Sequence, residues 1–147
     1  SKSIFPWRTV LQNIQFGLQT QKRVSATVAR ERCTEYIKIV GLEGYEHYFP
    51  YQLSGGMQQR VAIARALICE PEVLLMDEPL NALDETTRDR LCKLLRTIHA
   101  QIKLTTLHIT HSRSEARQVA DKFFLLTQGK LQERPVRELD ATATTSP

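Results

Sequence analysis

A run of apolar residues at positions 73–76 ends directly in two carboxylates, Asp77 and Glu78. A continuous apolar run of this length is typical of a strand that is covered on both faces in a parallel sheet. Residues 104–110 and 122–127 also have the length and composition of strands. Because helical periodicity separates the three runs, the order strand, helix, strand, helix, strand predicts an α/β sheet for the second half of the chain.

Amphipathic helices are predicted for much of the remaining sequence. Apolar residues recur at helical spacing over residues 9–18, 25–40, 55–68 and 84–102, and a further helix is predicted to begin at residue 112. Gly41 provides a stop for the second of these helices, and Ser112 with Glu115 has the pattern of a capping box. The pair Gln128-Gly129 predicts a turn from residues 122–127 into an antiparallel partner strand.

Composition and charge narrow the classes of function. The net charge of +4 comes from basic residues that are scattered through the helices, so we expect no nucleic-acid partner. Cys33, Cys69 and Cys92 lack CxxC spacing, which predicts reduced core residues of a cytosolic protein and neither zinc ligands nor a disulfide framework. No apolar run approaches the roughly 18 residues that cross a bilayer. We therefore expect any membrane association to go through a partner.

The helix over residues 55–68 opens with Ser54, Gly55 and Gly56. The first amide groups of a helix lack intrahelical partners and carry partial positive charge, so a helix start can bind an anion. Ser54 can cap the helix or bind a phosphate, and the glycines remove side chains that would block one. Taken alone, a turn of this kind is more often an ordinary junction between a loop and a helix.

Two strand ends carry further polar groups. Asp77 and Glu78 follow one predicted strand and His111 follows the next, so all three are expected at the same edge of a parallel sheet. In such an arrangement the first carboxylate can hold Mg²⁺, commonly through water, and the second can orient or deprotonate an attacking water. Acidic residues after a strand also cap helices, but the combination with His111 and the Ser-Gly-Gly helix start favours nucleotide phosphate chemistry.

These segments resemble, in order and in spacing, the nucleotide-binding subunits of ABC transporters. Leu-Ser-Gly-Gly-Met-Gln-Gln-Arg at residues 53–60 resembles the signature motif, and residues 74–79 resemble Walker B. Residues 81–84 resemble the D-loop, and Thr110-His111 resembles the switch histidine. The resemblance extends over about residues 4 to 134. It implies a P-loop NTPase core of α/β class, here incomplete, with an α-helical subdomain.

The resemblance also implies a division of the chain. Residues 1–52 would form the helical subdomain that follows the Q-loop. Residues 53–134 would form the part of the ATPase core with the signature helix, Walker B, D-loop and switch histidine. Residues 135–147 would form a C-terminal tail, which the Ala/Thr composition of its last residues predicts to be disordered.

In this family two ATPase subunits face each other head to tail, and the signature helix of one closes on ATP held by the other. The resemblance implies that the γ-phosphate is contacted in trans by Ser54, Gly55, Gly56 and Gln58. It implies that Asp84 links the two sites across the dimer. A second ATPase subunit is therefore an expected partner, and ATP an expected cofactor.

The hydrolytic groups follow from the same resemblance. Asp77 would serve Mg²⁺, Glu78 would be the general base, and His111 would contact the γ-phosphate and its developing charge. The implied activity is ATP hydrolysis with ATP and Mg²⁺ as cofactors.

The segment at residues 4–10, with Asn13 and Ile14, resembles the part of the family that follows the Q-loop and faces the membrane subunit. It implies that a transmembrane permease contacts the chain near Pro6 and Trp7, although a tryptophan beside a proline is also common in simple packing. The Pro-Trp pair in this segment resembles that of importers of nitrate, sulfonates or taurine. The segment is also similar to that of polyamine, iron and molybdate importers. The implied location is peripheral, at the cytoplasmic face of the inner (plasma) membrane.

The sequence also departs from the family pattern. The 147 residues contain no GxxxxGK[ST], and the Q-loop glutamine would fall immediately before Ser1. Ser112 stands where the family usually has Asp, and Asn81 where Ser or Gly is frequent. A phosphate-binding loop of this kind supplies the amides and lysine that hold the β- and γ-phosphates. We expect these residues alone to bind ATP poorly, to be marginally stable, and to leave the sheet with an uncovered face and edge.

Three hypotheses remain. In the first, the chain is the C-terminal part of the ATPase subunit of an importer for a small solute. In the second, it is a non-catalytic partner or truncated relic that donates Ser54-Gly55-Gly56 in trans. In the third, it belongs to a non-transport ABC ATPase that works on ribosomes or DNA repair. The importer-like segment around Pro6 and Trp7 and the lack of a long coiled-coil insertion disfavour the third.

Overall fold

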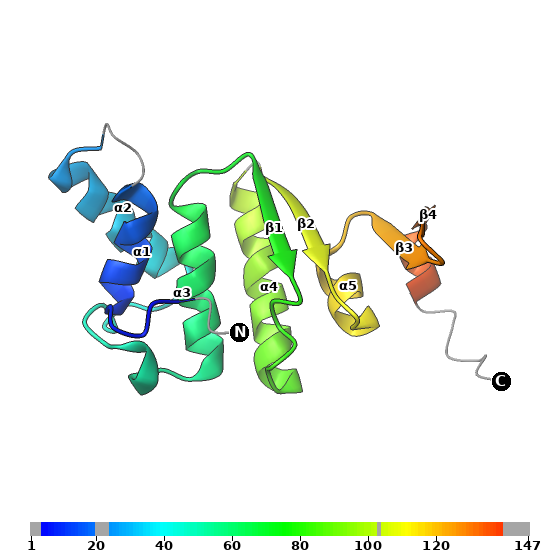
Figure 1. The fold of residues 1–147 in the computed structure, drawn as a ribbon, viewed down its shortest axis with the longest axis horizontal. Helices are drawn as coiled ribbons and strands as arrows, with labels where there is room; N and C mark the ends of the chain where they lie inside the picture. The colour runs from blue at the N-terminus through cyan, green and yellow to red at the C-terminus, as the bar shows by residue number, and fades with distance from the viewer. Residues whose placement is uncertain (1–3, 20–23, 103, 140–147) are drawn as a thin grey trace.

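A computed structural model describes residues 4–19, 24–102 and 104–139. Its first half is helical, with α1 at Val10–Gln19, α2 at Ala26–Ile39, the 3-10 turn η1 at Pro50–Gln52 and α3 at Gly55–Leu67 (Figure 1). The second half alternates strands and helices: β1 Val73–Asp77, α4 Glu85–Gln101, β2 Thr105–Ile109, α5 Arg113–Val119, β3 Phe123–Thr127, β4 Lys130–Arg134 and the 3-10 turn η2 Val136–Leu139. The predicted elements are therefore confirmed to within a few residues.

Side-chain caps determine where the helices begin. Ser25 Oγ accepts from the Val28 amide at the start of α2, and Ser54 Oγ accepts from the Met57 amide at the start of α3. Each cap satisfies an amide group that has no partner within its helix. Gly41, at φ +64°, follows the end of α2 in the left-handed region that glycine adopts at little cost. No helix in the described part of the chain is both long and apolar enough to cross a membrane.

The helices of the first half form one packed layer around fully buried aliphatic side chains, among them Ile14, Ile37, Val61 and Ile68. Each such side chain contributes roughly 1.5–3 kcal/mol relative to an exposed position. Helix α1 comes so close to α3 that a Cβ atom at Gly17 would lie 2.7 Å from the Arg65 carbonyl oxygen. The two helices therefore need a glycine at this crossing.

Strands β1 and β2 pair in parallel, with Val73 opposite Thr105 and Asp77 opposite Ile109. Leu74 and Met76 point inward to a core that also contains the buried face of α4. The opposite face of the sheet is open: Leu75 is 71% exposed, and Val73, Leu107 and Ile109 are also exposed. The prediction that both faces of β1 are covered is therefore wrong for the described residues, because these residues provide an apolar layer for one face only. The open face agrees with the separate expectation that the sheet keeps an uncovered face.

The predicted hairpin is present. Strands β3 and β4 pair antiparallel around Gln128 and Gly129, which both have positive φ. Within the described residues this hairpin is a separate two-stranded sheet and does not pair with β2, so the prediction of a single sheet is corrected. In Figure 1 the hairpin lies apart from β1 and β2, on the far side of α5. Periodicity identifies a strand but not the edge with which it forms hydrogen bonds.

Part of the predicted tail is ordered. Residues 136–139 form η2, and Leu139 is buried near α5. The prediction of disorder is therefore wrong for these residues, because one apolar side chain packs against a neighbouring helix. Residues 140–147 lie outside the described residues.

Cys33 lies on α2 and Cys92 on α4, and Cys69 lies in the turn that follows α3. Cys33 and Cys92 are buried, Cys69 is half-buried, and none forms a disulfide.

Candidate active site

The carboxyl ends of β1 and β2 bring Glu78 and His111 together. The His111 Nε2 atom lies 2.6 Å from the Glu78 Oε1 atom. Asn81 Nδ2 donates to the other carboxylate oxygen, Glu78 Oε2, over 2.6 Å. The Glu78 amide donates to the Ile109 carbonyl and extends the pairing of the two strands by one residue. Both oxygens of the Glu78 carboxylate are thus held in place.

Glu78 has an unusual backbone conformation. Its φ of +45° lies in the left-handed region, which costs a residue with a side chain about 1–2 kcal/mol. Strained residues of this kind persist where the surroundings hold them, and they cluster at functional sites. The turn places the Glu78 side chain beyond the end of β1, where it is only half-buried, beside the exposed imidazole of His111.

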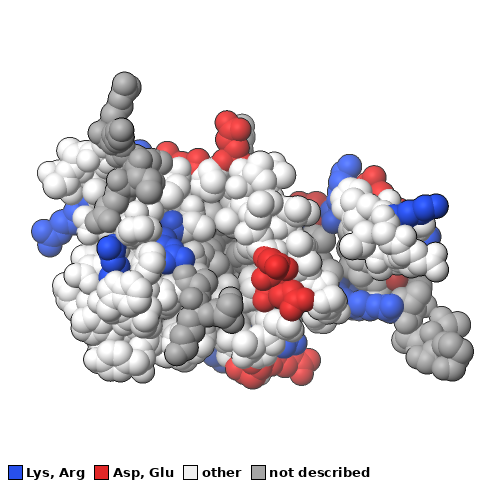
Figure 2. All heavy atoms as spheres, in the orientation of Figure 1, with Lys and Arg blue, Asp and Glu red and all other residues white. Residues whose placement is uncertain are grey.

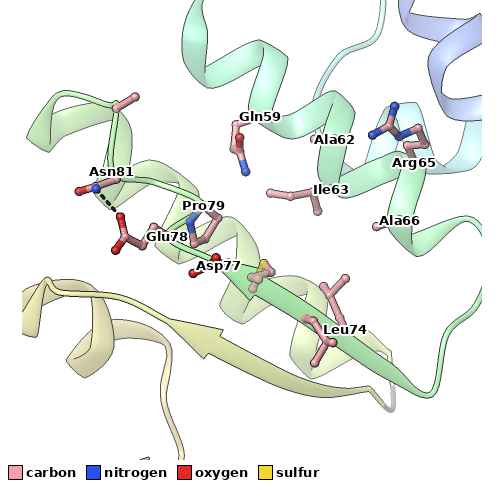
Figure 3. A pocket seen from close by; sticks show the side chains of 13 residues that line it. Gln59, Ala62, Ile63, Arg65, Ala66, Leu74, Asp77, Glu78, Pro79 and Asn81 are labelled. Atoms are coloured by element: carbon pink, nitrogen blue, oxygen red, sulfur yellow. Dashed lines mark hydrogen bonds between the residues drawn. The ribbon is translucent and has the colours of Figure 1, made fainter. Parts of the chain in front are cut away.

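Asp77, the last residue of β1, is exposed beside an open hollow of about 910 Å³ between α3 and β1. Figure 3 shows Gln59 and Ile63 of α3 on one side of this hollow, with Asp77, Glu78 and Asn81 on the other. Figure 2 shows acidic side chains gathered over the carboxyl ends of β1 and β2, on a surface that is otherwise mostly uncharged there. The edge of the sheet is therefore acidic and open to solvent.

Ser54 and Gly55 are exposed at the start of α3, but Gly56 is buried. A Cβ atom at Gly56 would lie 2.5 Å from Thr87 Cγ2 in the first turn of α4. A Cβ atom at Gly55 would lie 3.4 Å from Leu83 Cδ2, which is an ordinary contact. Close packing of α3 against α4 thus requires a glycine at position 56, whereas position 55 keeps an open face toward solvent.

The Gln58 side chain has different surroundings from Ser54, Gly55 and Gly56. Its Nε2 atom donates to the Pro50 carbonyl over 2.8 Å and to the Leu53 carbonyl over 3.2 Å. The amide is directed back toward the turn before α3 and holds that turn together. A phosphate contact from the amide nitrogen of Gln58 would require these bonds to be exchanged.

Asp84 caps α4: its Oδ1 atom accepts from the Thr87 amide over 2.9 Å. Hydrogen bonds from the Thr87 side chain and amide hold the pKa of the exposed Asp84 carboxyl below its usual value. Since Thr87 also faces Gly56, the starts of α3 and α4 lie side by side. The site residues therefore fall into two groups, one at these helix starts and one at the ends of β1 and β2.

A buried network that the sequence did not reveal flanks His111. Glu115, 2% exposed, places Oε1 2.5 Å from His108 Nε2 and accepts at Oε2 from the Thr110 hydroxyl. Ser112 Oγ accepts from the Glu115 amide, so half of the predicted capping box is present. The Glu115 carboxylate binds His108 of β2 and Thr110, which follows that strand, instead of completing the box. The signal for it was His108, a polar residue whose side chain is largely buried on β2.

The fold is that of the ABC ATPases. The chain matches the structure of cbiO1 from Clostridium perfringens, part of an ABC transporter complex, with a TM-score of 0.85 and 28% identity over 95% of this chain and 55% of that one. It matches a dimeric ATP-binding cassette bound to ADP and Pi with a TM-score of 0.76 and 34% identity, over 93% of this chain and 61% of that one. The predicted fold class is confirmed.

The family model for ABC transporters matches residues 1–81, which is more than half of the chain. The chain therefore belongs to the ABC transporter family, as its motifs predicted. The spermidine/putrescine import ATP-binding protein PotA of Treponema pallidum is 50% identical over 131 residues, which make up 89% of this chain and 34% of that protein. The chain spans between about a third and about half of the length of the curated relatives that it matches.

Proposed function

We propose that these residues belong to the ATPase subunit of an ABC importer for a small solute. They would form its signature helix and the sheet edge, at the carboxyl ends of β1 and β2, where ATP is hydrolysed. The observation that carries the proposal is the contact between His111 and Glu78 beyond the ends of two parallel strands. Membership of the ABC transporter family and the similarity to an import ATP-binding protein support it.

Glu78 is proposed as the general base that takes a proton from the attacking water. Asn81 holds one oxygen of its carboxylate at the edge of the sheet, and His111 contacts the other. General-base catalysis accounts for roughly 10²–10⁴ in rate. His111 is proposed to contact the γ-phosphate. To do so, its Nε2 atom must leave Glu78 and form a hydrogen bond with a phosphate oxygen instead.

Asp77 is proposed as the residue that serves Mg²⁺. No group of three or more His, Cys, Asp or Glu side chains among the described residues is arranged to hold a metal ion. An exposed carboxylate nevertheless suits Mg²⁺, an ion that keeps several waters and takes one or two carboxylates together with substrate phosphates. When bound, Mg²⁺ would neutralise charge on the β- and γ-phosphates.

Ser54, Gly55 and Gly56 are proposed to contact the γ-phosphate of ATP held by a second ATPase subunit, with Gln58 in support and Asp84 linking the two sites. The exposed start of the 13-residue helix α3 supports this role, because its dipole and first amides attract an anion. The nucleotide's phosphates would then be held by a Walker A loop that is not among these 147 residues.

The division of the chain is proposed to follow these roles. Residues 1–52 would be the helical subdomain, residues 53–134 part of the ATPase core and residues 135–147 the C-terminal segment. The loop at Pro6 and Trp7 is proposed to meet a transmembrane permease, and Trp7 is 71% exposed there. The subunit would then be peripheral at the cytoplasmic face of the inner membrane.

The experiment is phosphate release in Mg-ATP by the protein made from the complete open reading frame that encodes these residues. Glu78→Gln is expected to lower turnover about 10²–10⁴-fold and to leave ATP binding intact. The matched control is Glu72→Gln, an exposed position before β1, which should turn over like wild type. Unchanged turnover in Glu78→Gln would contradict the proposal. A reading frame that encodes no GxxxxGK[ST] would favour the non-catalytic partner instead.

A further inference from the structure

Asn13 is a fully buried polar residue on α1, and its side chain binds the loop that carries Pro6 and Trp7. Its Oδ1 atom accepts from the Phe5 amide over 2.8 Å. Its Nδ2 atom donates to the carbonyls of Phe5, Arg8 and Thr9 over 3.0–3.1 Å. One side chain therefore holds both ends of the loop.

The orientation of the Asn13 amide is determined by these partners. The Phe5 amide can only donate and the three carbonyls can only accept, so a flipped amide would break the whole set of bonds. A buried amide that loses its partners costs roughly 1–3 kcal/mol for each unsatisfied group. The loop therefore has one strongly preferred conformation on α1.

The start of α1 is also held from the other side. The amides of Val10 and Leu11, in the first turn of α1, donate to the carbonyls of Tyr48 and Glu46 over 2.9 and 3.0 Å. These donors have no partner within the helix, and the segment before η1 satisfies them. The base of the loop is therefore held between Asn13 and residues 46–48.

Phe5 connects the loop to the signature helix. Its ring contacts two guanidinium groups, with the Cζ atom of Arg8 5.3 Å from the ring centroid and that of Arg65 5.0 Å from it. The Phe5 ring also lies 5.6 Å from the Trp7 ring. Arg65 belongs to α3, so a chain of ring and cation–π contacts leads from Trp7 to the helix that begins at Gly55.

We propose that Asn13 is a positioning residue that presets the Trp7 loop for docking to the permease, and that Arg65 couples this loop to α3. The inference rests on the proposed permease contact at Pro6 and Trp7. A preset loop loses less conformational entropy when a partner binds it. With Gly17 packed on the backbone of Arg65, a displacement of the docked loop would move α1 and α3 together, and with them the start of the signature helix.

Trp7 is the single tryptophan of the chain, so its fluorescence reports on this loop directly. The experiment is time-resolved anisotropy of Trp7 in the 147-residue chain without nucleotide or permease. In wild type the decay should be dominated by tumbling of the whole molecule. In Asn13→Asp, which keeps the acceptor and removes the donors to the three carbonyls, the amplitude of fast local motion should rise about twofold or more.

Gln12→Ala is the matched control, because it removes the side-chain oxygen that accepts from the Thr9 amide and leaves the four Asn13 bonds in place. Its Trp7 decay should resemble wild type. Arg65→Met, which keeps a long apolar stem, is the second variant should Asn13→Asp fail to fold, and it should raise the fast amplitude by loosening Phe5. Folding of each variant is checked by circular dichroism.

Equal Trp7 decays in wild type and a folded Asn13→Asp protein, or in wild type and Arg65→Met, would overturn the corresponding half of the proposal. The readout needs neither ATP nor a partner. A failure here would therefore leave the proposed ATPase function standing, and a failure of Glu78 to affect turnover would leave the positioning role of Asn13 standing.

Discussion

The imidazole Nε2 atom of His111 lies 2.6 Å from the Oε1 atom of Glu78, across the ends of two parallel strands that are separate in sequence. His111 is 83% exposed, whereas Glu78 is 35% exposed and is also held by Asn81. The carboxylate is therefore the ordered member of the pair, and the imidazole is the member that is free to leave toward a bound phosphate.

We expect His111→Ala to lower phosphate release about 10²–10³-fold in the protein from the complete reading frame, the usual cost of losing one donor to a developing charge. Turnover should fall, whereas the Kd for ATP should stay close to that of wild type. His47→Ala, at an exposed position away from the strand ends, is the control. A His111→Ala protein with normal turnover would show that the contact with Glu78 is only structural.

Gly56→Ala should lower the free energy of unfolding by about 1–3 kcal/mol, the usual cost of overpacking. The new Cβ atom would lie 2.5 Å from Thr87 Cγ2, at the contact between α3 and α4. Thr87→Ser removes that methyl group, so the double variant should recover most of the loss. Urea denaturation of the two single variants and the double variant measures this coupling. Additive effects would rule out the close contact as the reason for the glycine.

Asp84→Ala should lower the melting temperature at pH 7, because the start of α4 loses its capping acceptor. Hydrogen bonds from Thr87 lower the pKa of Asp84 in the folded chain. The stability that the Asp84 carboxylate contributes is therefore fully present above its unfolded pKa of about 4 and is lost as the pH falls through its folded pKa. The difference from wild type should shrink in acid. Asp84→Asn keeps a neutral acceptor, and its melting temperature should not show this loss. A difference in melting temperature between Asp84→Ala and wild type that stays constant down to pH 2 would argue against capping by the Asp84 carboxylate.

Cys33 and Cys92 should resist alkylation in the folded chain. Burial raises the pKa of both thiols to about 11, so little reactive thiolate is present at neutral pH. Half-buried Cys69 should react first with iodoacetamide, as followed by mass spectrometry. Labelling of all three should become fast in denaturant. Rapid labelling of Cys33 or Cys92 without denaturant would mean that the core opens readily.

The sequence predicts the elements of this fold better than their pairing. Caps at Ser54 and Asp84 and the carboxylates after β1 follow from local patterns, and the structure has the expected helix starts and strand end. The separate β3–β4 sheet and the open face at Leu75 depend on which strands and helices are close in space, which periodicity does not record.

The candidate site shows the same division. The approach of His111 to Glu78 followed from the rule that parallel strands end at one edge. The inward His108 indicated a buried partner without identifying it as Glu115, and no local pattern indicated the direction of the Gln58 amide. Each is set by a hydrogen-bond partner that depends on the packing of another element.

The start of α3 is proposed to bind a nucleotide phosphate and thus to be more than a junction between a loop and a helix. Gly55→Asp separates these two roles, because position 55 is exposed and an acidic residue in the first turn suits the helix dipole. Phosphate release by the complete protein should fall about 100-fold or more in Gly55→Asp and far less in the neutral Gly55→Asn, with α3 as stable as in wild type. Equal turnover in Gly55→Asp and wild type would contradict the claim.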